Sequence, residues 1–307
     1  MGLLALGRGA GAQAPAARAA TAAAIVRPEA PIVRPYEQET WATPANGVDT
    51  RVVAALQQAG LAPAHPCSDE VFIRRVYLDV IGTLPEPADV RRFLQDPNPA
   101  KRAALIDALL ARDEFTDYWT LKWGDMLRVK SEFPINLWPN AVQAYSHWIR
   151  ESVRANLPYD QFARALLTSS GSNFKVPPVN FYRAVQDRTP PGLAAAVAQT
   201  FMGVRLAGWT ADQRADLANF FSRLAYKHTG EWKEEIIYLD FTATGPLAVT
   251  FPDGTKAVVP AGQDPRVALA DWLIRPENPY FTRALVNRVG LGFWAGDYCQ
   301  SGRHPPG

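Results

Sequence analysis

The chain has 307 residues, of which 48% are hydrophobic and 20% are charged, so it has enough apolar material for a buried core and is not a disordered protein. Lysine plus arginine exceeds aspartate plus glutamate by 32 to 30, and the formal net charge of +2 argues against a nucleic-acid-binding protein. The 2 cysteines cannot form a four-thiolate metal site or a disulfide framework.

Residues 1–24 are rich in alanine and contain Ala12-Gln13-Ala14, a small-x-small pattern of the kind that signal peptidase cleaves. We interpret this segment as a signal peptide that lacks its charged start, or as an alanine-rich leader. The expected location is therefore periplasmic or extracellular. No later stretch has the ~20 apolar residues of a transmembrane span. Residues 25–48 are rich in proline, which interrupts helical hydrogen bonding, and are predicted to form a linker.

Residues 49–230 are predicted to form a multi-helix domain, because their apolar residues recur at three- and four-residue spacing. Ser68 is expected to cap a helix that ends at Gly82, and Pro87 to open the next one. Thr210 and Gln213 have the spacing of a capping box. The predicted helical stripes are Val52/Val53/Leu56, Phe72/Val76/Val80, Phe93/Leu94, Leu105/Ala108/Leu109, Trp119/Trp123/Leu127, Val142/Tyr145/Ile149/Val153, Phe162/Leu166/Leu167, Leu193/Val197/Phe201 and Leu217/Phe220/Phe221/Leu224.

The composition changes after Gly230. Residues 231–262 are rich in β-branched and aromatic residues and are predicted to form a small sheet, with a tight hairpin turn at Asp253-Gly254. Helical spacing returns within residues 263–307, which are expected to contribute one or two C-terminal helices. The predicted fold class is therefore mainly α with a small β-hairpin or sheet insertion.

Long ordered strings also carry a family resemblance. SDEVFIRRVYLDVIGTLPEPADVRRFL, WIRESVRANLPYDQFARALLTSSGSNFKVPPVNFYRA and QTFMGVRL resemble the planctomycete-type domain-of-unknown-function family 1549 over most of residues 49–227. Residues 264–289 resemble the start of its companion, family 1553, and we expect this second domain to be truncated. The resemblance implies an exported protein that accompanies other extracytoplasmic or cytochrome-like proteins, without an established activity.

One family feature is absent from the sequence. Between the equivalents of Leu206 and Trp209, family members carry a Cys-x-x-Cys-His segment, whereas this chain has only Ala207 and Gly208. That motif attaches haem through two thiols and an imidazole, or binds another metal. We therefore expect no cofactor and no metal. Gly208 is predicted to supply the positive φ that turns the chain between two helices.

Asp79 is the leading candidate for a functional carboxylate. It lies near a predicted helix C-terminus, where the macrodipole disfavours negative charge, so Arg75 four residues earlier is expected to pair with it. With Arg74, Tyr77 and Asp125 these residues form a candidate polar network, which is either a structural ion-pair cluster or an acid/base site.

Arginines and tryptophans outside this network also have two interpretations. Arg183 and Arg205 either pair with acidic residues or hold an anionic ligand. The 9 tryptophans allow a sugar-stacking platform, yet the helical spacing of Trp119, Trp123, Trp148 and Trp272 favours core packing.

Two functions follow from the sequence, and it does not decide whether the protein is an enzyme. The favoured hypothesis is an extracytoplasmic binding or assembly module, the remnant of a redox-linked complex, with an unknown partner. The alternative is an enzyme that acts on an extracellular polymer through carboxylates such as Asp79 and Asp125.

Overall fold

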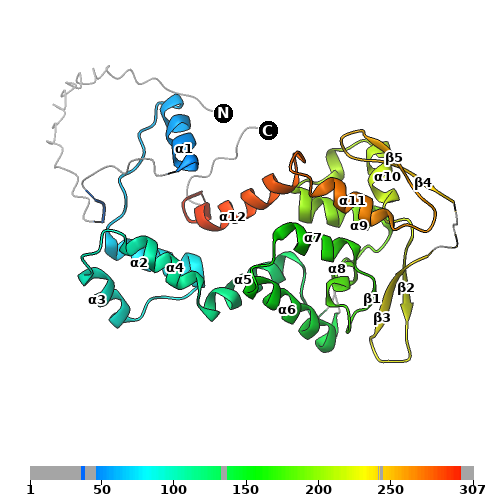
Figure 1. Ribbon diagram of the computed structural model, residues 1–307, viewed down its shortest axis with the longest axis horizontal. Helices are drawn as coiled ribbons and strands as arrows, with labels where there is room; N and C mark the ends of the chain where they lie inside the picture. The colour runs from blue at the N-terminus through cyan, green and yellow to red at the C-terminus, as the bar shows by residue number, and fades with distance from the viewer. Residues whose placement is uncertain (1–35, 39–45, 133–136, 241, 243–244, 299–307) are drawn as a thin grey trace, which may run out of the picture. The chain divides into compact units, whose positions relative to one another are not determined.

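The computed structural model describes residues 36–38, 46–132, 137–240, 242 and 245–298 (Figure 1). It divides into two compact units, residues 1–66 and residues 67–307. The predicted leader, most of the predicted linker and residues 299–307 lie outside the described residues. No helix in the described part of the chain is long and apolar enough to cross a membrane.

The first unit contains α1 (Gly47–Gln58). The Asn46 side chain accepts hydrogen bonds from the backbone N–H groups of Val48 and Asp49 at 2.8 and 3.0 Å, which satisfies donors that the first helical turn leaves free. No residue of α1 is buried, so within the described residues this unit has no hydrophobic core of its own.

The second unit begins with a small helical cluster of α2 (Asp69–Ile81), α3 (Pro87–Gln95) and α4 (Lys101–Leu110). These helices bury a common core of Ile73, Val76, Tyr77, Val80, Ile81, Phe93 and Leu109. Gly82 ends α2 with φ +72°, as its position predicted. Ser68 occupies the N-cap position, but its side chain accepts no capping hydrogen bond. Lys101 and Arg102 of α4 both pair with Asp69 at 2.7 Å and fasten α4 to the start of α2.

The remaining helices share a larger core. They are α5 (Asp113–Met126), α6 (Trp138–Arg154), α7 (Tyr159–Thr168), α8 (Asn180–Arg183), α9 (Pro190–Val197), α10 (Ala211–Asn219), α11 (Pro265–Leu273) and α12 (Phe281–Tyr298). Tyr145, Ile149, Leu166, Leu193 and Val197 of the predicted stripes are all 0–1% exposed in this core. The amphipathic spacing therefore predicted the buried faces of these helices correctly.

Two small antiparallel sheets complete the unit. The strands β1 (Gly171–Ser172), β2 (Leu224–His228) and β3 (Glu235–Leu239) pair in the order β1-β3-β2, with Tyr226 opposite Ile237. The strands β4 (Leu247–Thr250) and β5 (Lys256–Val259) form the predicted hairpin. Gly254 has φ +84° in its turn. The mainly α fold class with a small β insertion is therefore confirmed.

Two strands of the three-stranded sheet, β1 and β2, lie before the predicted β segment 231–262. Leu224 was expected on a helix with Phe220 and Phe221, but α10 ends at Asn219 and Leu224 opens β2. The physical reason is long-range pairing, because the backbone from Leu224 to His228 bonds to β3. The spacing of apolar residues in one segment does not show that a strand further along the chain will pair with it.

The join between α9 and α10 also differs from the expectation. The helix continues beyond Val197 as a π-helix (Ala198–Met202) and ends at Gly203, whose φ is +67°. Leu206–Gly208 forms a 3₁₀ turn, so the prediction that Gly208 supplies the positive φ is wrong, since Gly203 has already reversed the chain. The predicted capping box is confirmed, because Thr210 and Gln213 each bond the other's backbone N–H.

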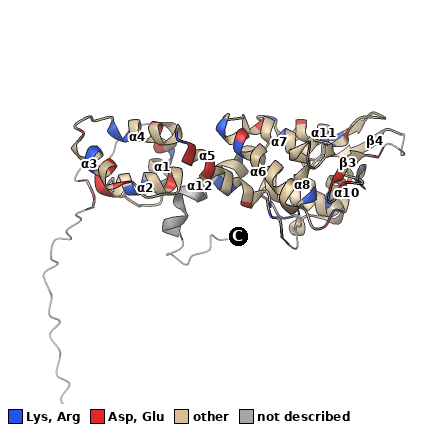
Figure 2. Ribbon diagram, turned by 90° about the horizontal axis from the view of Figure 1, so that it is seen from below, with Lys and Arg blue, Asp and Glu red and all other residues tan. Residues whose placement is uncertain are grey.

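Acidic and basic residues are interspersed along α2 to α5 (Figure 2). Some charged residues are buried, and Arg266 is the least exposed arginine among them. Arg266 of α11 is 1% exposed, and its guanidinium donates to the backbone oxygens of Ser169 at 2.9 Å and Thr168 at 3.2 Å. The same group pairs with Asp264 at 2.8 Å. Arg266 therefore ties α11 to the end of α7.

Candidate functional site

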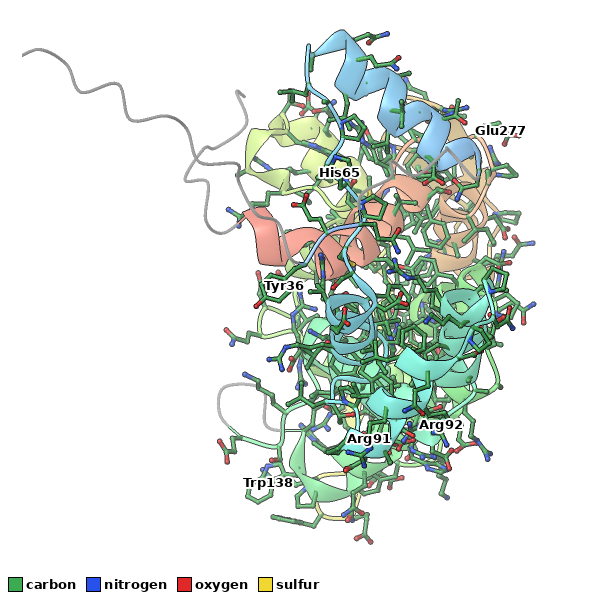
Figure 3. The ribbon with its side chains drawn as sticks, turned by 90° about the vertical axis from the view of Figure 1, so that its left-hand side faces the viewer. Tyr36, His65, Arg91, Arg92, Trp138 and Glu277 are labelled. Atoms are coloured by element: carbon green, nitrogen blue, oxygen red, sulfur yellow. The ribbon has the colours of Figure 1, made fainter. Side chains whose placement is uncertain are left out.

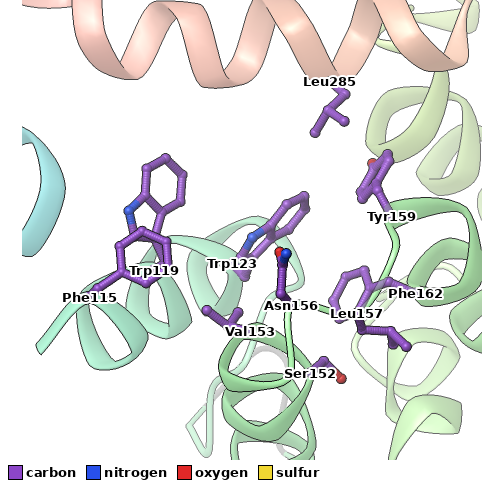
Figure 4. A pocket seen from close by; sticks show the side chains of 10 residues that line it. All are labelled: Phe115, Trp119, Trp123, Ser152, Val153, Asn156, Leu157, Tyr159, Phe162 and Leu285. Carbon is purple, nitrogen blue, oxygen red and sulfur yellow. The ribbon is translucent and has the colours of Figure 1, made fainter. Parts of the chain in front are cut away.

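An aromatic groove follows α5 on the side that faces α12. A cavity of about 180 Å³ is lined by Phe115, Trp119, Trp123, Ser152, Val153, Asn156, Leu157, Tyr159, Phe162 and Leu285. Figure 4 shows the rings of Trp119 and Trp123 extending from α5, with Leu285 of α12 pointing toward them. The rings of Trp123 and Tyr159 lie 5.5 Å apart, and those of Phe115 and Trp119 lie 6.1 Å apart. The groove is therefore a run of neighbouring aromatic rings.

The spacing along α5 explains this arrangement. Phe115, Trp119 and Trp123 are four residues apart, so their side chains lie on one face of the helix. Phe115 packs against the small core, and Trp123 packs against the larger core. Trp119 lies between them and is half-buried. The groove thus lies where the two cores meet.

A second cavity of about 250 Å³ continues the groove and adds charged side chains. It shares Trp119, Trp123 and Leu285 with the first cavity. Its other lining residues are Asp79, Tyr118, Lys122, Asp125, Met126, Arg288 and Val289. The two cavities together form the aromatic groove. It offers stacking faces along its length, with two carboxylates and two basic groups at one end.

Asp79 and Asp125, which the sequence analysis selected together, line this same cavity. Asp79 is half-buried on α2, whereas Asp125 is exposed on α5. Burial raises the pKa of the Asp79 carboxyl, and the charge of Arg75 lowers it by a smaller amount. Among the described residues the expected Asp79–Arg75 pair does not reach ion-pair distance, so Arg75 acts on Asp79 only through its field. A raised carboxyl pKa is a property of general acids as well as of structural carboxyls.

The structure separates the other members of the predicted polar network from this cavity. The Tyr77 hydroxyl donates to Asp89 Oδ2 at 3.0 Å, and burial together with this bond raises the pKa of Tyr77. Arg74 is exposed on α2. Arg75 and Asp79 line another cavity, of about 440 Å³, together with Cys67. The five residues therefore do not form one continuous network.

Arg183 and Arg205, for which the sequence allowed the same two interpretations, have different surroundings in the structure. Arg183 Nε donates to Glu235 Oε2 at 2.7 Å, and both side chains are at most 7% exposed. Arg205 is exposed and forms no ion pair with any described residue.

The tryptophans selected from the sequence also differ in their surroundings. Trp272 is 2% exposed in the core, whereas Trp119 and Trp123 line the groove. Trp148 stacks on Phe162 at 4.9 Å.

Several groove residues were not selected from the sequence as functional. Tyr159, Leu285, Lys122 and Arg288 come from three helices and meet only in the folded chain. The spacing of Phe115, Trp119 and Trp123 was visible, but the same spacing is typical of core stripes. Within the described ranges, no group of three or more His, Cys, Asp or Glu side chains is placed to hold a metal.

The fold and groove define a mainly α protein with two small antiparallel sheets and an aromatic groove along one helix. Residues 47–208 match the family model PSCyt2, described as a protein of unknown function (DUF1549). The match covers more than half of the chain, so the chain belongs to this family. Comparisons with curated proteins and with solved structures gave no match. Because the family match ends at residue 208, the similarity of residues 264–289 to family 1553 stays a prediction.

Proposed function

We propose that this protein is a binding module whose aromatic groove holds a saccharide segment. The observation that carries this proposal is the pair of half-buried indoles, Trp119 and Trp123, that line a cavity bordered by carboxylates. A sugar ring has apolar C–H faces and a rim of hydroxyl groups. Aromatic faces suit the first, and carboxylate or amide groups suit the second.

The lining residues of the groove include both aromatic faces and hydrogen-bonding groups. Trp119, Trp123 and Tyr159 provide aromatic surface, while Asn156 of the first cavity and Asp79 and Asp125 of the second provide hydrogen-bonding groups. A helix stripe that served only the core would bury its indoles against neighbouring side chains, as Trp272 does. Large aromatic surface left in a cavity is typical of a site of interaction.

The export interpretation belongs to the same proposal. The alanine-rich leader and the family membership support an extracytoplasmic location, where saccharides and other exported proteins are the accessible ligands. Assembly with cytochrome-like proteins is part of the proposal, because the family resemblance implies a Cys-x-x-Cys-His segment where this chain has Ala207 and Gly208. In this hypothesis the module retains a binding role without the haem segment.

The proposal is tested by titrating the full chain with cellohexaose and chitohexaose, followed by tryptophan fluorescence and calorimetry. Trp119→Ala is expected to weaken binding about tenfold, equivalent to about 1.4 kcal/mol. Trp232→Ala is the matched control, because Trp232 is 63% exposed and does not line the groove. Equal affinity of both variants, or no binding of either oligosaccharide by the parent chain, contradicts the proposal.

A second candidate function is hydrolysis of a polymer at the same groove, supported by the two carboxylates in one cavity. Asp79, with its raised pKa, has the property of a general acid, and exposed Asp125 that of a base or nucleophile. Release of reducing ends from the oligosaccharides measures this activity. Asp79→Asn should abolish it and retain binding, whereas Asp107→Asn, an exposed carboxylate of α4 outside the groove, should change neither.

A further inference from the structure

A further cavity, which shares only Arg288 with the lining of the aromatic groove, lies where the π-helix and its following turn meet α12. Its volume is about 790 Å³. The lining residues are Gln199, Met202, Gly203, Val204, Arg205, Pro279, Tyr280, Arg283, Ala284, Asn287 and Arg288. We call it the arginine pocket, because three arginines line it and no described lining residue is acidic.

The pocket arginines differ from the two buried arginines that have acidic partners. Arg183 and Arg266 are buried and pair with Glu235 and Asp264, respectively. Arg205 and Arg283 are exposed, and neither forms an ion pair with a described residue. The arginine pocket therefore collects positive charge that the described part of the protein does not neutralise.

Arg288 is the partly buried member of this group. Its Nη2 donates to the backbone oxygen of Gln199, while its Nη1 is buried without a hydrogen-bond partner among the described atoms. Burial lowers the pKa of Arg288. Burial and the like charge of Arg288 lower the pKa of Arg128. The Nη1 atom of Arg128 also lacks a hydrogen-bond partner among the described atoms. Arg128 does not line the arginine pocket, but its like charge adds to the positive potential at Arg288, which an anion in the pocket would offset.

The backbone around the pocket is closely packed. Gly203 has φ +67°, and a Cβ atom built on it would lie 3.3 Å from Ala284 Cβ. The turn that carries Arg205 can therefore pass close to α12, which carries Arg283 and Arg288. The turn and α12 therefore form two adjacent walls of the same cavity.

We propose that the arginine pocket binds a small polyanion with phosphate or carboxylate groups through Arg205, Arg283 and Arg288. Guanidinium groups form paired hydrogen bonds with the oxygens of phosphate and carboxylate groups. Three such groups around one cavity suit a ligand with more than one anionic group. This inference goes beyond the saccharide proposal and does not depend on it, because Arg205 and Arg283 do not line the aromatic groove.

The test is calorimetric titration of the full chain with pyrophosphate and, separately, with citrate. The single variants Arg205→Gln and Arg283→Gln remove exposed side chains and should leave the fold intact. Each is expected to weaken binding about tenfold, the effect of losing one hydrogen bond between charged groups. Arg91→Gln is the matched control, because Arg91 is exposed on α3 and does not line the arginine pocket (Figure 3).

The two probes separate the possible ligand chemistries. Binding of pyrophosphate alone assigns a phosphate-bearing ligand, binding of citrate alone assigns a polycarboxylate, and binding of both assigns a pocket that selects charge. In each case the affinity should fall as NaCl is raised. The proposal is overturned if neither probe binds, or if Arg205→Gln and Arg283→Gln bind as tightly as Arg91→Gln. Trp119→Ala should bind both probes like the parent chain, so failure of the saccharide proposal leaves this test unaffected.

Discussion

The Nε atom of Arg183 lies 2.7 Å from Oε2 of Glu235, and the two side chains are 7% and 3% exposed. Arg188 adds a second guanidinium, whose Nη1 donates to both carboxylate oxygens of Glu235 at 3.1 Å. The Glu235 backbone N–H donates to Asn173 Oδ1 at 2.9 Å. One carboxylate on β3 thus pairs with two arginines that follow β1 in the chain.

We therefore expect Glu235→Gln to destabilise the protein by about 3 kcal/mol, because a buried guanidinium loses its counter-charge. Urea unfolding followed by circular dichroism measures the change. Glu231→Gln is the control, since Glu231 is exposed four residues earlier and should unfold like the parent chain. Identical midpoints for the two variants would show that the Arg183–Glu235 pair contributes nothing to stability.

Arg266→Leu tests the connection between α11 and α7. Leucine fills much of the volume but leaves the backbone oxygens of Thr168 and Ser169 without their buried donor, so we expect a loss of about 3 kcal/mol. The free energy of unfolding from urea titration is the measurement. Arg275→Leu, an exposed arginine beyond the end of α11, should change it by less than about 0.5 kcal/mol. Comparable losses in both variants would contradict the anchoring role.

Asp79→Asn should stabilise the protein at neutral pH. Burial raises the folded-state pKa of Asp79, so the ionised carboxylate is disfavoured in the folded protein, and stability falls as the pH rises from the unfolded pKa of about 4 through the folded value. Asparagine removes this loss. Because the side chain is only half-buried, we expect a gain below about 1 kcal/mol at pH 7 and none at pH 3. Thermal unfolding at both pH values measures it, and a gain that persists at pH 3 would assign the effect to packing.

Gly82→Ala should cost more than an ordinary left-handed glycine substitution. Gly82 and Gly262 both have positive φ, +72° and +76°, so an alanine at either position carries a strain of about 1–2 kcal/mol. A Cβ at Gly82 would also overlap the ring of Tyr118, whereas nothing lies within 4 Å of one at Gly262. The excess loss of Gly82→Ala over Gly262→Ala, measured by urea unfolding, reports this contact. Equal losses would mean that Tyr118 moves aside freely.

The helical part of the fold was predictable because its causes are local. The spacing of Phe72, Val76 and Val80 reveals the buried face of α2, and Thr210 with Gln213 reveals the start of α10. The turn at Asp253-Gly254 was equally visible, since few residues tolerate its backbone angles. The identity of the strand at Leu224–His228 was not visible, because it depends on pairing with β3.

The same distinction applies to the candidate sites. Local sequence patterns were enough to predict most helices and the family, and to select Asp79, Asp125, Arg183 and Arg205 as residues of interest. Packing between distant parts of the chain places Asp79 and Asp125 in one cavity, pairs Arg183 with Glu235, and brings Arg205 into one cavity with Arg283 and Arg288. The helical spacing of apolar residues indicates which side of a helix is buried. Which residues face each other across a cavity depends on how helices that are distant in the chain pack together, and no local sequence pattern contains that information.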